Sequence, residues 1–385
     1  MKLALTLFKY FPYGGLQRNF LAIAMELVRR GRSVTVYTGD WDGPRPDGLT
    51  IVEFTPSGLM NATRNRSVHR QLTERLKRDP ADVVVGFNKM PGLDVYYAAD
   101  TCFAAKAFEQ KGPLYRLTPR CSCSLEYEEA VFSQASSTEI LLLSAVEGEI
   151  YKRRYATQPA RFHLMPPGIS RNRVRDEKSD ELATLKRKEF GIGPEQKIVI
   201  FLGSDYKRKG LDRLLTAMAA LPEACRHSTR LLIVGRDKRQ RKYQALARRL
   251  GVADRAQFLG ERDDIPGLLF ASDLLVHPAY LENTGNVLLE AAVAGAPVIC
   301  TGICGYSHYI RDNDLGRVIE EPFVQDSLDR ALCQMLTEGR DWRDKCRKFT
   351  ETADLFSRPQ RAAETIEAIG RTKKEKGTRA ADSAE

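Results

Sequence analysis

The stretch AYLENTGNVLLEAAVAGAPV, residues 279–298, has the pattern of a strand end, a polar turn, a short helix and a helix stop. The apolar run Leu274–Val276 before it is typical of a buried strand. Asn283 or Thr284 can cap the helix, and Gly295 stands where a helix C-terminus favours a residue able to adopt a positive φ. The stretch therefore predicts a strand, loop and helix in direct succession.

Two carboxylates of this stretch are expected to have different surroundings. Glu282 falls in the loop ahead of the helix, where free backbone N–H groups and the positive end of the helix dipole gather. Glu290 falls about two turns further in, on a helix otherwise composed of Val, Leu and Ala. A carboxylate among apolar neighbours needs a partner, and for a lone helical Glu the ordinary partner is a nearby base or water.

The first half of the chain alternates apolar strands with amphipathic helices. The apolar strand 3–8, a glycine turn, the helix 16–30 and the strand 33–37 form a βαβ unit. Further strands are expected at 50–54, 82–87 and 139–143, with helices at 64–78 and 127–134. A strand near Phe162 then runs into Pro166-Pro167-Gly168, and this break predicts a domain boundary.

The alternation restarts after a polar stretch, residues 170–182, that is expected to be a linker or an exposed loop. Strands are expected at 197–202, 230–234, 256–259, 273–276, 297–300 and 316–319, with helices at 211–221 and 243–250. The predicted organisation is a domain at 1–168, a domain at 169–355, a C-terminal helix at 356–372 and a disordered tail at 373–385. Packing back on the first domain is one option for that helix.

The predicted fold class is α/β, with two Rossmann-like domains facing a central cleft. A chain of 385 residues accommodates two domains, and 43% hydrophobic with 29% charged residues is ordinary for a globular protein. Open α/β sheets bind ligands beyond the carboxyl ends of their strands. The loops at those ends are therefore expected to line the cleft.

The composition and the cysteine pattern limit which cellular compartment and which cofactors are expected. No apolar run is long enough for a bilayer, and Met1–Leu5 leads into a strand pattern rather than a signal peptide, so we expect a cytoplasmic protein. Neither Cys121-x-Cys123 nor Cys300-x3-Cys304 has the second ligand pair of a structural zinc site, so we expect free thiols and no metal. The net charge of +10 fits a nucleic acid, an anionic membrane or a phosphorylated substrate.

Two loops ahead of helices are candidate anion sites. Gly14-Gly15 lets backbone amides approach an anion, although the third glycine of the dinucleotide fingerprint is missing. Lys207-Arg208-Lys209 comes directly before a predicted helix, where cations meet the unfavourable end of the dipole unless an anion lies among them. A solvated turn explains Lys207 well, whereas Arg208 and Lys209 together favour a diphosphate site.

The spacing Glu282-x7-Glu290, preceded by His277-Pro278 and followed by a Gly and a Pro, resembles the donor-site signature of retaining GT-B glycosyltransferases. The resemblance implies the GT-B fold. It also implies that the first Glu contacts hydroxyls of the donor sugar and that the second binds the ribose of the nucleotide. These roles compete with the simpler reading of Glu290 as the partner of a nearby base.

The same resemblance assigns further residues to the donor. The family places an Arg and a Lys on the donor diphosphate, here Arg208 and Lys209, where they stabilise the departing UDP as charge develops. Arg173 is a further candidate for binding the nucleotide sugar. Gly14 and Gly15 are expected to contribute backbone amides.

Four other motifs extend the resemblance over nearly the whole chain and indicate a narrower family. They are Lys9–Arg18, Val84–Tyr96, Pro166–Ile169 and Cys304–Ile310. Together they resemble the lipopolysaccharide core heptose-I glucosyltransferases, of glycosyltransferase family 4 type. This resemblance implies UDP-glucose as donor, retention at the anomeric carbon, no metal or other cofactor, and the inner-core heptose of lipopolysaccharide as acceptor.

The resemblance also implies a location and an acid. It predicts an acceptor-binding first domain, a nucleotide-sugar-binding second domain, and peripheral attachment to the anionic cytoplasmic face of the inner membrane. Asp100 becomes a candidate active-site acid on the acceptor side.

Some positions depart from the family pattern. Asn19 stands where the family usually has Asp, so an acidic role in the first loop is absent, although we keep Asn19 among the expected donor contacts. Asn283, Thr284, Gly285 and Asn286 stand where small apolar residues are common. Because these four are expected beside the sugar pocket, the donor stays open between glucose and another sugar.

The segment 102–132, which is basic and docks on anionic lipid in the family, is balanced in charge here. Its cations are Lys106, Lys111, Arg116 and Arg120, and its acids are Glu109, Glu126, Glu128 and Glu129. Membrane contact would then depend on the apolar side chains Phe103, Phe108, Leu114, Tyr115 and Leu117.

Other functions stay open at this point. The same two-domain fold could use another UDP-sugar or acceptor, or act as a UDP-sugar epimerase. A nucleic-acid or lipid-surface binding module would explain the positive charge. The cations are scattered, however, and no aromatic-basic recognition motif appears, so we expect no nucleic-acid partner.

Overall fold

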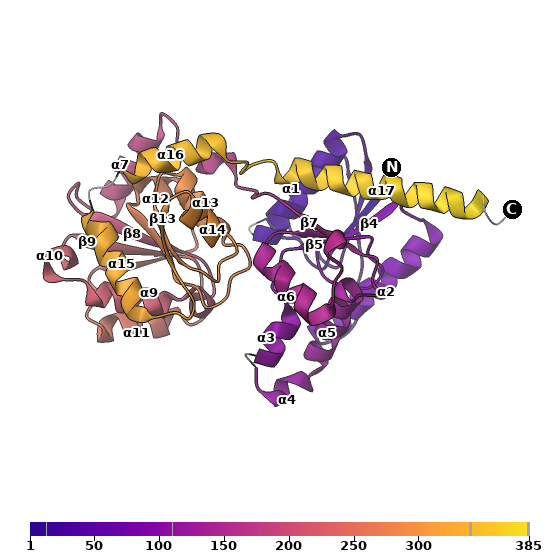
Figure 1. Cartoon of the computed structure of the whole chain (residues 1–385), viewed down its shortest axis with the longest axis horizontal. Helices are drawn as coiled ribbons and strands as arrows, with labels where there is room; N and C mark the ends of the chain where they lie inside the picture. The colour runs from indigo at the N-terminus through magenta and orange to yellow at the C-terminus, as the bar shows by residue number, and fades with distance from the viewer. Residues whose placement is uncertain (13, 110, 339–340, 383–385) are drawn as a thin grey trace. The chain divides into compact units, whose positions relative to one another are not determined.

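The computed structural model describes residues 1–12, 14–109, 111–338 and 341–382. The chain divides into two compact units. The N-terminal unit comprises Met1–Gly168 together with Ser357–Glu385, and the C-terminal unit comprises Ile169–Phe356. Each unit is an α/β structure built on its own parallel sheet (Figure 1).

The N-terminal unit has a seven-stranded sheet in the order β3-β2-β1-β4-β5-β6-β7. Its strands are β1 (Lys2–Leu7), β2 (Ser33–Thr38), β3 (Leu49–Glu53), β4 (Val83–Gly86), β5 (Val95–Ala98), β6 (Glu139–Leu142) and β7 (Phe162–Leu164). All the pairings are parallel. The strand order reverses beside β1, as in a doubly wound Rossmann sheet, so the loops after β1 and β4 flank the ligand position typical of such sheets.

Helices cover both faces of this sheet. They are α1 (Gly15–Arg29), α2 (Asn61–Arg78), α3 (Phe103–Glu109), α4 (Pro113–Arg116), α5 (Pro119–Phe132), α6 (Ala145–Tyr155) and α17 (Arg358–Asp382). Successive side chains of a strand face opposite sides. Val83 and Val85 accordingly pack with α1 and α17, which lie side by side in Figure 1, whereas Val84 packs with α2, α5 and α6.

The C-terminal unit has a six-stranded parallel sheet in the order β10-β9-β8-β11-β12-β13. Its strands are β8 (Lys197–Leu202), β9 (Thr229–Val234), β10 (Ala256–Gly260), β11 (Leu274–His277), β12 (Val298–Thr301) and β13 (Gly316–Ile319). Its helices are α7 (Ser179–Glu189), α8 (Tyr206–Lys209), α9 (Leu211–Ala220), α10 (Glu223–Arg226), α11 (Gln240–Arg249), α12 (Ile265–Ala271), α13 (Asn286–Val293), α14 (Ser307–Asp312), α15 (Gln325–Thr337) and α16 (Trp342–Thr352). Short 3-10 turns lie at Arg171–Arg173 in this unit and at Pro159–Arg161 in the N-terminal unit.

The core of this unit is divided by its sheet in the same way. Ile198 and Ile200 of β8 pack with α12 and α13, whereas Val199 and Phe201 pack with α9 and α15 on the other face. The predicted fold of two Rossmann-like domains is confirmed. No helix in the described ranges combines the length and the apolar character that crossing a membrane requires.

One strand was missed by the sequence analysis, and two predicted segments are corrected. Strand β5, which the sequence analysis missed, lies between β4 and β6 and has the sequence Val-Tyr-Tyr-Ala, with all four residues buried. Residues 179–182 are not part of an exposed loop, because they begin α7. Residues 373–382, expected to be disordered, continue α17, where Lys373 Nζ lies 2.8 Å from Asp94 of the same unit. Residues 383–385 lie outside the described ranges.

Candidate active site

The loops after β8 and β11 meet at the carboxyl edge of the C-terminal sheet. The backbone N–H of Tyr280 donates to the carbonyl of Arg208 at 2.8 Å. Gly210 has φ +77°, and a Cβ there would lie 1.9 Å from the carbonyl oxygen of Pro278. Glycine is therefore required where the two loops touch, both for its conformation and for the close approach.

Glu282 lies at the centre of a buried ionic cluster on these loops. Its carboxylate pairs with Lys209 Nζ, lies 3.6 Å from Arg208 NH1 and lies 3.2 Å from His277 Nε2. The backbone N–H of Asn283 also donates to it at 3.2 Å. The predicted sugar-binding carboxylate and the two predicted diphosphate cations are thus brought together.

Burial and charge act in opposite directions within this cluster. Burial of Glu282 disfavours its charged form, but Lys209, His277 and Arg208 outweigh burial and lower the pKa of that carboxyl. Burial lowers the pKa of His277, so its imidazole is neutral at neutral pH and can donate Nε2–H to Glu282. The cluster therefore holds an ionised carboxylate beside two cations.

The cation triplet lies directly before α9, as predicted, and it also forms a short helix that the sequence analysis did not predict. Lys207, Arg208 and Lys209 belong to the short helix α8, and Gly210 separates them from α9. Asp205 caps α8 and lies 3.7 Å from Arg208 Nε. The side chain of Lys207 is 57% exposed and lies over the Tyr280 ring, as expected of a solvated residue.

The start of α13 also differs from the prediction. Gly285, with φ +80°, is the N-cap residue, and neither Asn283 nor Thr284 caps the helix. The carbonyls of Asn283 and Thr284 instead accept from the backbone N–H groups of Gly305 and Tyr306, at 3.0 and 2.8 Å. These bonds fix the loop against the segment after β12, which prevents either residue from folding onto the helix.

Helix α13 carries two further predicted donor residues. Because the helix begins at Asn286, Glu290 lies only about one turn in, rather than two. Its carboxylate lies 3.6 Å from Arg173 Nε, and both side chains are largely buried. Glu290 is therefore paired with a basic side chain, Arg173, which is the ordinary arrangement considered for a lone helical Glu. The side-chain oxygen of Asn286 is buried without a hydrogen-bond partner among the described residues.

In the N-terminal unit, the Gly14-Gly15 turn leads into α1. A Cβ on Gly14 would lie 1.9 Å from the side-chain oxygen of Gln17, whereas a Cβ on Gly15 would meet nothing within 4 Å. Asn19 donates to the carbonyl of Gly15 at 2.9 Å and lies 3.4 Å from NH1 of the buried Arg358. Tyr13 lies outside the described ranges.

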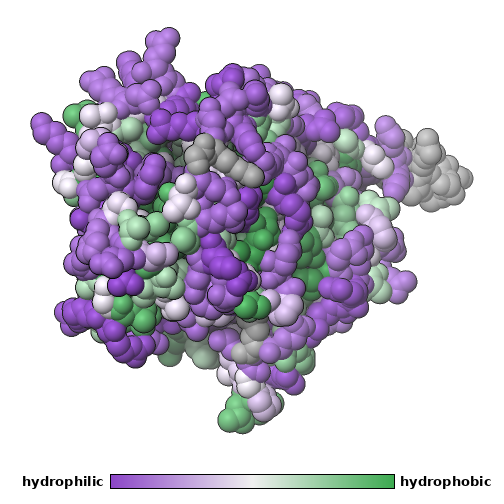
Figure 2. Space-filling model, turned by 60° about the vertical axis from the view of Figure 1, so that its left-hand side comes forward, coloured by the Kyte–Doolittle hydropathy of each residue, from purple (hydrophilic) through white to green (hydrophobic). Residues whose placement is uncertain are grey.

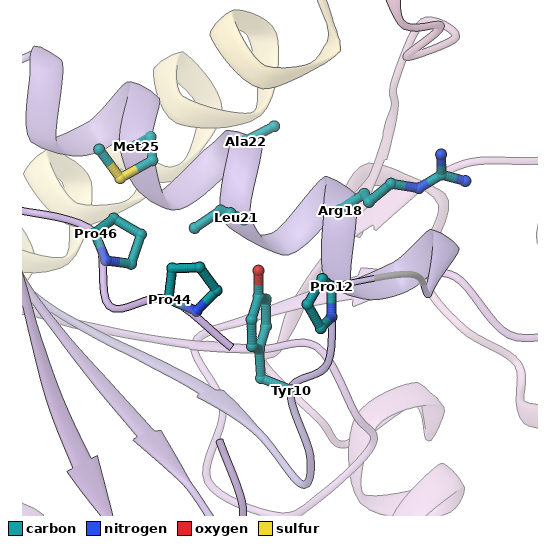
Figure 3. A pocket seen from close by; sticks show the side chains of 8 residues that line it. All are labelled: Tyr10, Pro12, Arg18, Leu21, Ala22, Met25, Pro44 and Pro46. Carbon is teal, nitrogen blue, oxygen red and sulfur yellow. The ribbon is translucent and has the colours of Figure 1, made fainter. Parts of the chain in front are cut away.

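A cavity of about 440 Å³ lies beside this turn. Figure 3 shows the Tyr10 hydroxyl directed into it, while the Arg18 guanidinium extends away from Met25. The lining residues are Tyr10, Pro12, Arg18, Leu21, Ala22, Met25, Pro44 and Pro46. None of the predicted site residues lines this largely apolar space.

Asp100 follows β5 at the carboxyl edge of the N-terminal sheet. Its side chain is exposed, and its backbone carbonyl accepts from the Tyr151 hydroxyl at 3.3 Å. In the described part of the chain, no hydrogen bond or ion pair involves its carboxylate. An exposed acid at this edge of a Rossmann-like sheet lies where ligands bind.

Comparison with known proteins gives the family. A family model described as "Glycosyl transferases group 1" matches residues 183–355. Lipopolysaccharide glucosyltransferase WaaG of Escherichia coli (strain K12) is 44% identical over 369 residues, which cover 95% of this chain and 98% of that protein. The chain belongs to this glycosyltransferase family.

Solved structures agree with the fold. The crystal structure of WaaG, described as a glycosyltransferase involved in lipopolysaccharide biosynthesis, has a TM-score of 0.88 at 44% identity and covers 94% of this chain and 99% of its own. Anabaena Alr3699/HepE, solved with UDP and glucose, has a TM-score of 0.72 at 18% identity and covers 96% and 100%. The second likeness concerns the GT-B fold alone.

Within the buried cluster around Glu282, His277 is a participant that the sequence analysis did not assign. Its ring is fully buried, and it lies five residues before Glu282. A histidine that ends an apolar strand, directly before Pro278, was the available signal. Across the described residues, no three His, Cys, Asp or Glu side chains gather as metal ligands. Independence from metal stays a prediction.

Proposed function

We propose that this glycosyltransferase transfers glucose from UDP-glucose to the inner-core heptose of lipopolysaccharide, with retention at the anomeric carbon. The observation that carries the proposal is the buried cluster of Glu282, Lys209, Arg208 and His277 at the carboxyl edge of the C-terminal sheet. The extended similarity to a lipopolysaccharide glucosyltransferase supports the donor and the acceptor.

Arg208 and Lys209 bind the donor diphosphate. The charge of the departing UDP grows as the bond between the sugar and the phosphate breaks, and fixed cations stabilise that charge. Lys209 Nζ pairs with Glu282 here, and in the proposed donor complex it turns to a phosphate. Glu282 is then available to accept hydrogen bonds from sugar hydroxyls, while His277 continues to hold it.

Further proposed donor contacts lie on α13 and in the loop before it. Glu290, supported by Arg173, accepts hydrogen bonds from ribose hydroxyls, since a carboxylate can bind a base and a hydroxyl at once. The unpaired side-chain oxygen of Asn286 supplies a further acceptor, beside Asn283, Thr284 and Gly285. Gly14, Gly15 and Asn19 are proposed contacts from the N-terminal unit.

Asp100 is the proposed acid of the acceptor side. Its exposed carboxylate can accept a hydrogen bond from an acceptor hydroxyl, which orients that hydroxyl and increases its nucleophilicity. The N-terminal unit therefore binds the acceptor, and the C-terminal unit binds the nucleotide sugar.

The segment between α3 and α5 is the proposed contact with the anionic inner face of the inner membrane. Leu114 and Leu117 are 80% and 81% exposed, and Phe108 is 42% exposed. Figure 2 shows apolar side chains at the lower tip of the molecule, where Figure 1 places α4. Phe103 and Tyr115 are only half exposed, with their rings 6.5 Å apart, so they support this tip rather than extend it.

One assay separates the proposal from its alternatives. UDP release would be measured with a panel of UDP-sugars, with and without truncated lipopolysaccharide that ends at the inner-core heptose. The proposal expects release that depends on the acceptor and is fastest with UDP-glucose. A UDP-sugar epimerase would instead convert donor alone to a second UDP-sugar. Preference for another donor or another acceptor would support the same fold with a different substrate.

A further inference from the structure

The backbone around Asp100 is held by side chains from other segments of the N-terminal unit. The Tyr151 hydroxyl, on α6, donates to the carbonyl of Asp100 at 3.3 Å. Lys89 Nζ, in the loop after β4, donates to the carbonyl of Thr101 at 3.2 Å. Two consecutive carbonyls are thus satisfied by side chains rather than by a regular element.

Two carboxylates hold the next three residues. Glu147 of α6 accepts from the backbone N–H of Cys102 at 2.8 Å. Glu128 of α5 accepts from the N–H groups of Phe103 and Ala104, at 2.7 and 2.8 Å, at the first turn of α3. The five residues from 100 to 104 therefore each have a backbone group bound by Lys89, Glu128, Glu147 or Tyr151, which we call the loop anchor.

The loop anchor is buried. Glu128 and Tyr151 have no exposed surface, Glu147 is 5% exposed, and the side chain of Lys89 is 10% exposed. Lys89 pairs with Glu128, which also accepts from the Tyr155 hydroxyl at 2.8 Å. A buried ion pair gives little net stability compared with well-packed apolar residues. Its most direct effect here is to fix the backbone that it binds.

The side chain of Asp100 and the groups that hold its backbone differ in their exposure to solvent. Its carboxylate is exposed, while the backbone on which it stands is bound by buried groups on α5, on α6 and after β4. Reacting groups must be held within about 0.5 Å of their productive geometry, and side chains that fix the loop from behind provide that. Displacement of a reacting group by about 1 Å costs roughly 100-fold in rate.

We propose that Lys89, Glu128, Glu147 and Tyr151 are positioning residues for Asp100 in the transfer reaction. The proposal rests on the acceptor role proposed for Asp100. The loop anchor acts through the backbone of residues 100–104 and does not touch either substrate. Because Glu128 binds the first turn of α3, the loop anchor also connects residues 100–104 to the helices that carry the exposed apolar tip.

The test uses the full-length protein with UDP-glucose and truncated lipopolysaccharide. The variants are Glu128→Gln, Glu147→Gln and Tyr151→Phe, with Glu149→Gln as control, because Glu149 lies on the same helix as Glu147 but is 62% exposed. We expect kcat/KM for the acceptor to fall roughly 10- to 100-fold in the first three. The control and the affinity of every variant for UDP should stay within about 2-fold of the original protein.

A double-mutant cycle separates positioning from a merely structural role. Each variant is combined with Asp100→Ala, and transfer and thermal midpoint are measured for all four proteins of the cycle. If the loop anchor acts through Asp100, the second substitution adds little further loss of transfer once Asp100 is gone. Losses that multiply, or losses that simply follow the thermal midpoint, overturn the proposal.

Two safeguards keep the outcome interpretable. Glu128→Gln leaves Lys89 buried without its carboxylate, so the variant can fail to fold; Lys89→Met with Glu128→Gln removes both charges, and Tyr151→Phe removes only a hydroxyl. If the unmodified protein transfers no glucose to the acceptor, the proposed function itself is contradicted. Full transfer by Asp100→Ala would leave the proposed function unaffected. It would contradict the role of Asp100 and therefore the positioning proposal.

Discussion

Lys209 and Glu282 form an ion pair in which both side chains are almost removed from solvent, at 13% and 9% exposure. Lys209 ends the short helix α8 after β8, and Glu282 lies in the loop after β11, the strand adjacent to β8 in the C-terminal sheet. A cation suited to phosphate and a carboxylate suited to sugar hydroxyls therefore meet at one point. A donor in which a sugar is joined to a diphosphate offers a chemical partner to each of the two side chains.

Removal of either cation should lower turnover far more than stability. Losing a charge-assisted hydrogen bond costs about 1.5–3 kcal/mol, or about 10- to 150-fold in rate. We expect losses of this size for Arg208→Ala and Lys209→Ala in UDP release, with little change of thermal midpoint. Lys207→Ala, on the same short helix but more exposed, is the matched control. Near-normal UDP release by either variant would rule out the diphosphate role.

The two glutamates should separate in their effect on UDP. Glu290 is proposed to bind the ribose, which UDP shares with every UDP-sugar. Glu290→Gln should therefore weaken the binding of UDP by about 1.5–3 kcal/mol. Glu282→Gln should leave UDP affinity nearly unchanged, while transfer falls and selectivity among donor sugars changes. Calorimetric titration with UDP and kinetics with a donor panel measure both effects.

The opposite pattern would reverse these assignments. If Glu282→Gln loses UDP while Glu290→Gln binds it normally, the two roles are exchanged. If neither substitution changes binding or turnover, the donor binds elsewhere. Because Glu290 pairs with Arg173, the thermal midpoint of Glu290→Gln must be measured beside its affinity.

Transfer should persist in excess EDTA. Arg208 and Lys209 supply positive charge where a divalent ion would otherwise stabilise the leaving diphosphate. The measurement is UDP release before and after chelation, with purified protein and acceptor. Loss of activity that Mg²⁺ or Mn²⁺ restores would falsify a metal-independent reaction.

The exposed tip at α4 should bind anionic vesicles reversibly. Leu114 and Leu117 insert into the interface, and the net charge of +10 adds an attraction that salt weakens, since the Debye length is about 8 Å at physiological ionic strength. We expect Leu114→Ser with Leu117→Ser to reduce sedimentation with anionic vesicles. Leu59→Ser, at another fully exposed leucine, is the control.

Two outcomes would count against this surface. Equal sedimentation with neutral and anionic vesicles would remove the electrostatic part of the prediction. Unchanged sedimentation of the double variant would show that the protein uses a different surface.

The sheets were predictable because their strands are apolar runs bounded by glycines or polar turns. Strand β8 and strand β13 match the predicted ranges without correction. Strand β5 has the sequence Val-Tyr-Tyr-Ala, which lacks the Val, Ile and Leu run of the strands that were predicted. The donor pattern around Glu282 was also visible, because spacing along a single loop and helix survives in the sequence.

Partnerships between distant residues were not predictable from spacing. Lys209 and Glu282 are 73 residues apart in the sequence, and their contact depends on the adjacency of β8 and β11 in the sheet. The start of α13 shifted because the carbonyls of Asn283 and Thr284 bond to a segment after β12. Local propensity favours a cap there, but tertiary hydrogen bonds compete for the same residues.

The most direct test of the proposed function is product analysis. Truncated lipopolysaccharide ending at the inner-core heptose would be incubated with the protein and UDP-glucose, and the product examined by mass spectrometry and NMR. We predict the addition of one hexose to the heptose, with the α configuration of the donor retained. A product of inverted configuration, or no hexose on the acceptor while UDP-glucose is consumed or isomerised, would contradict the proposed reaction.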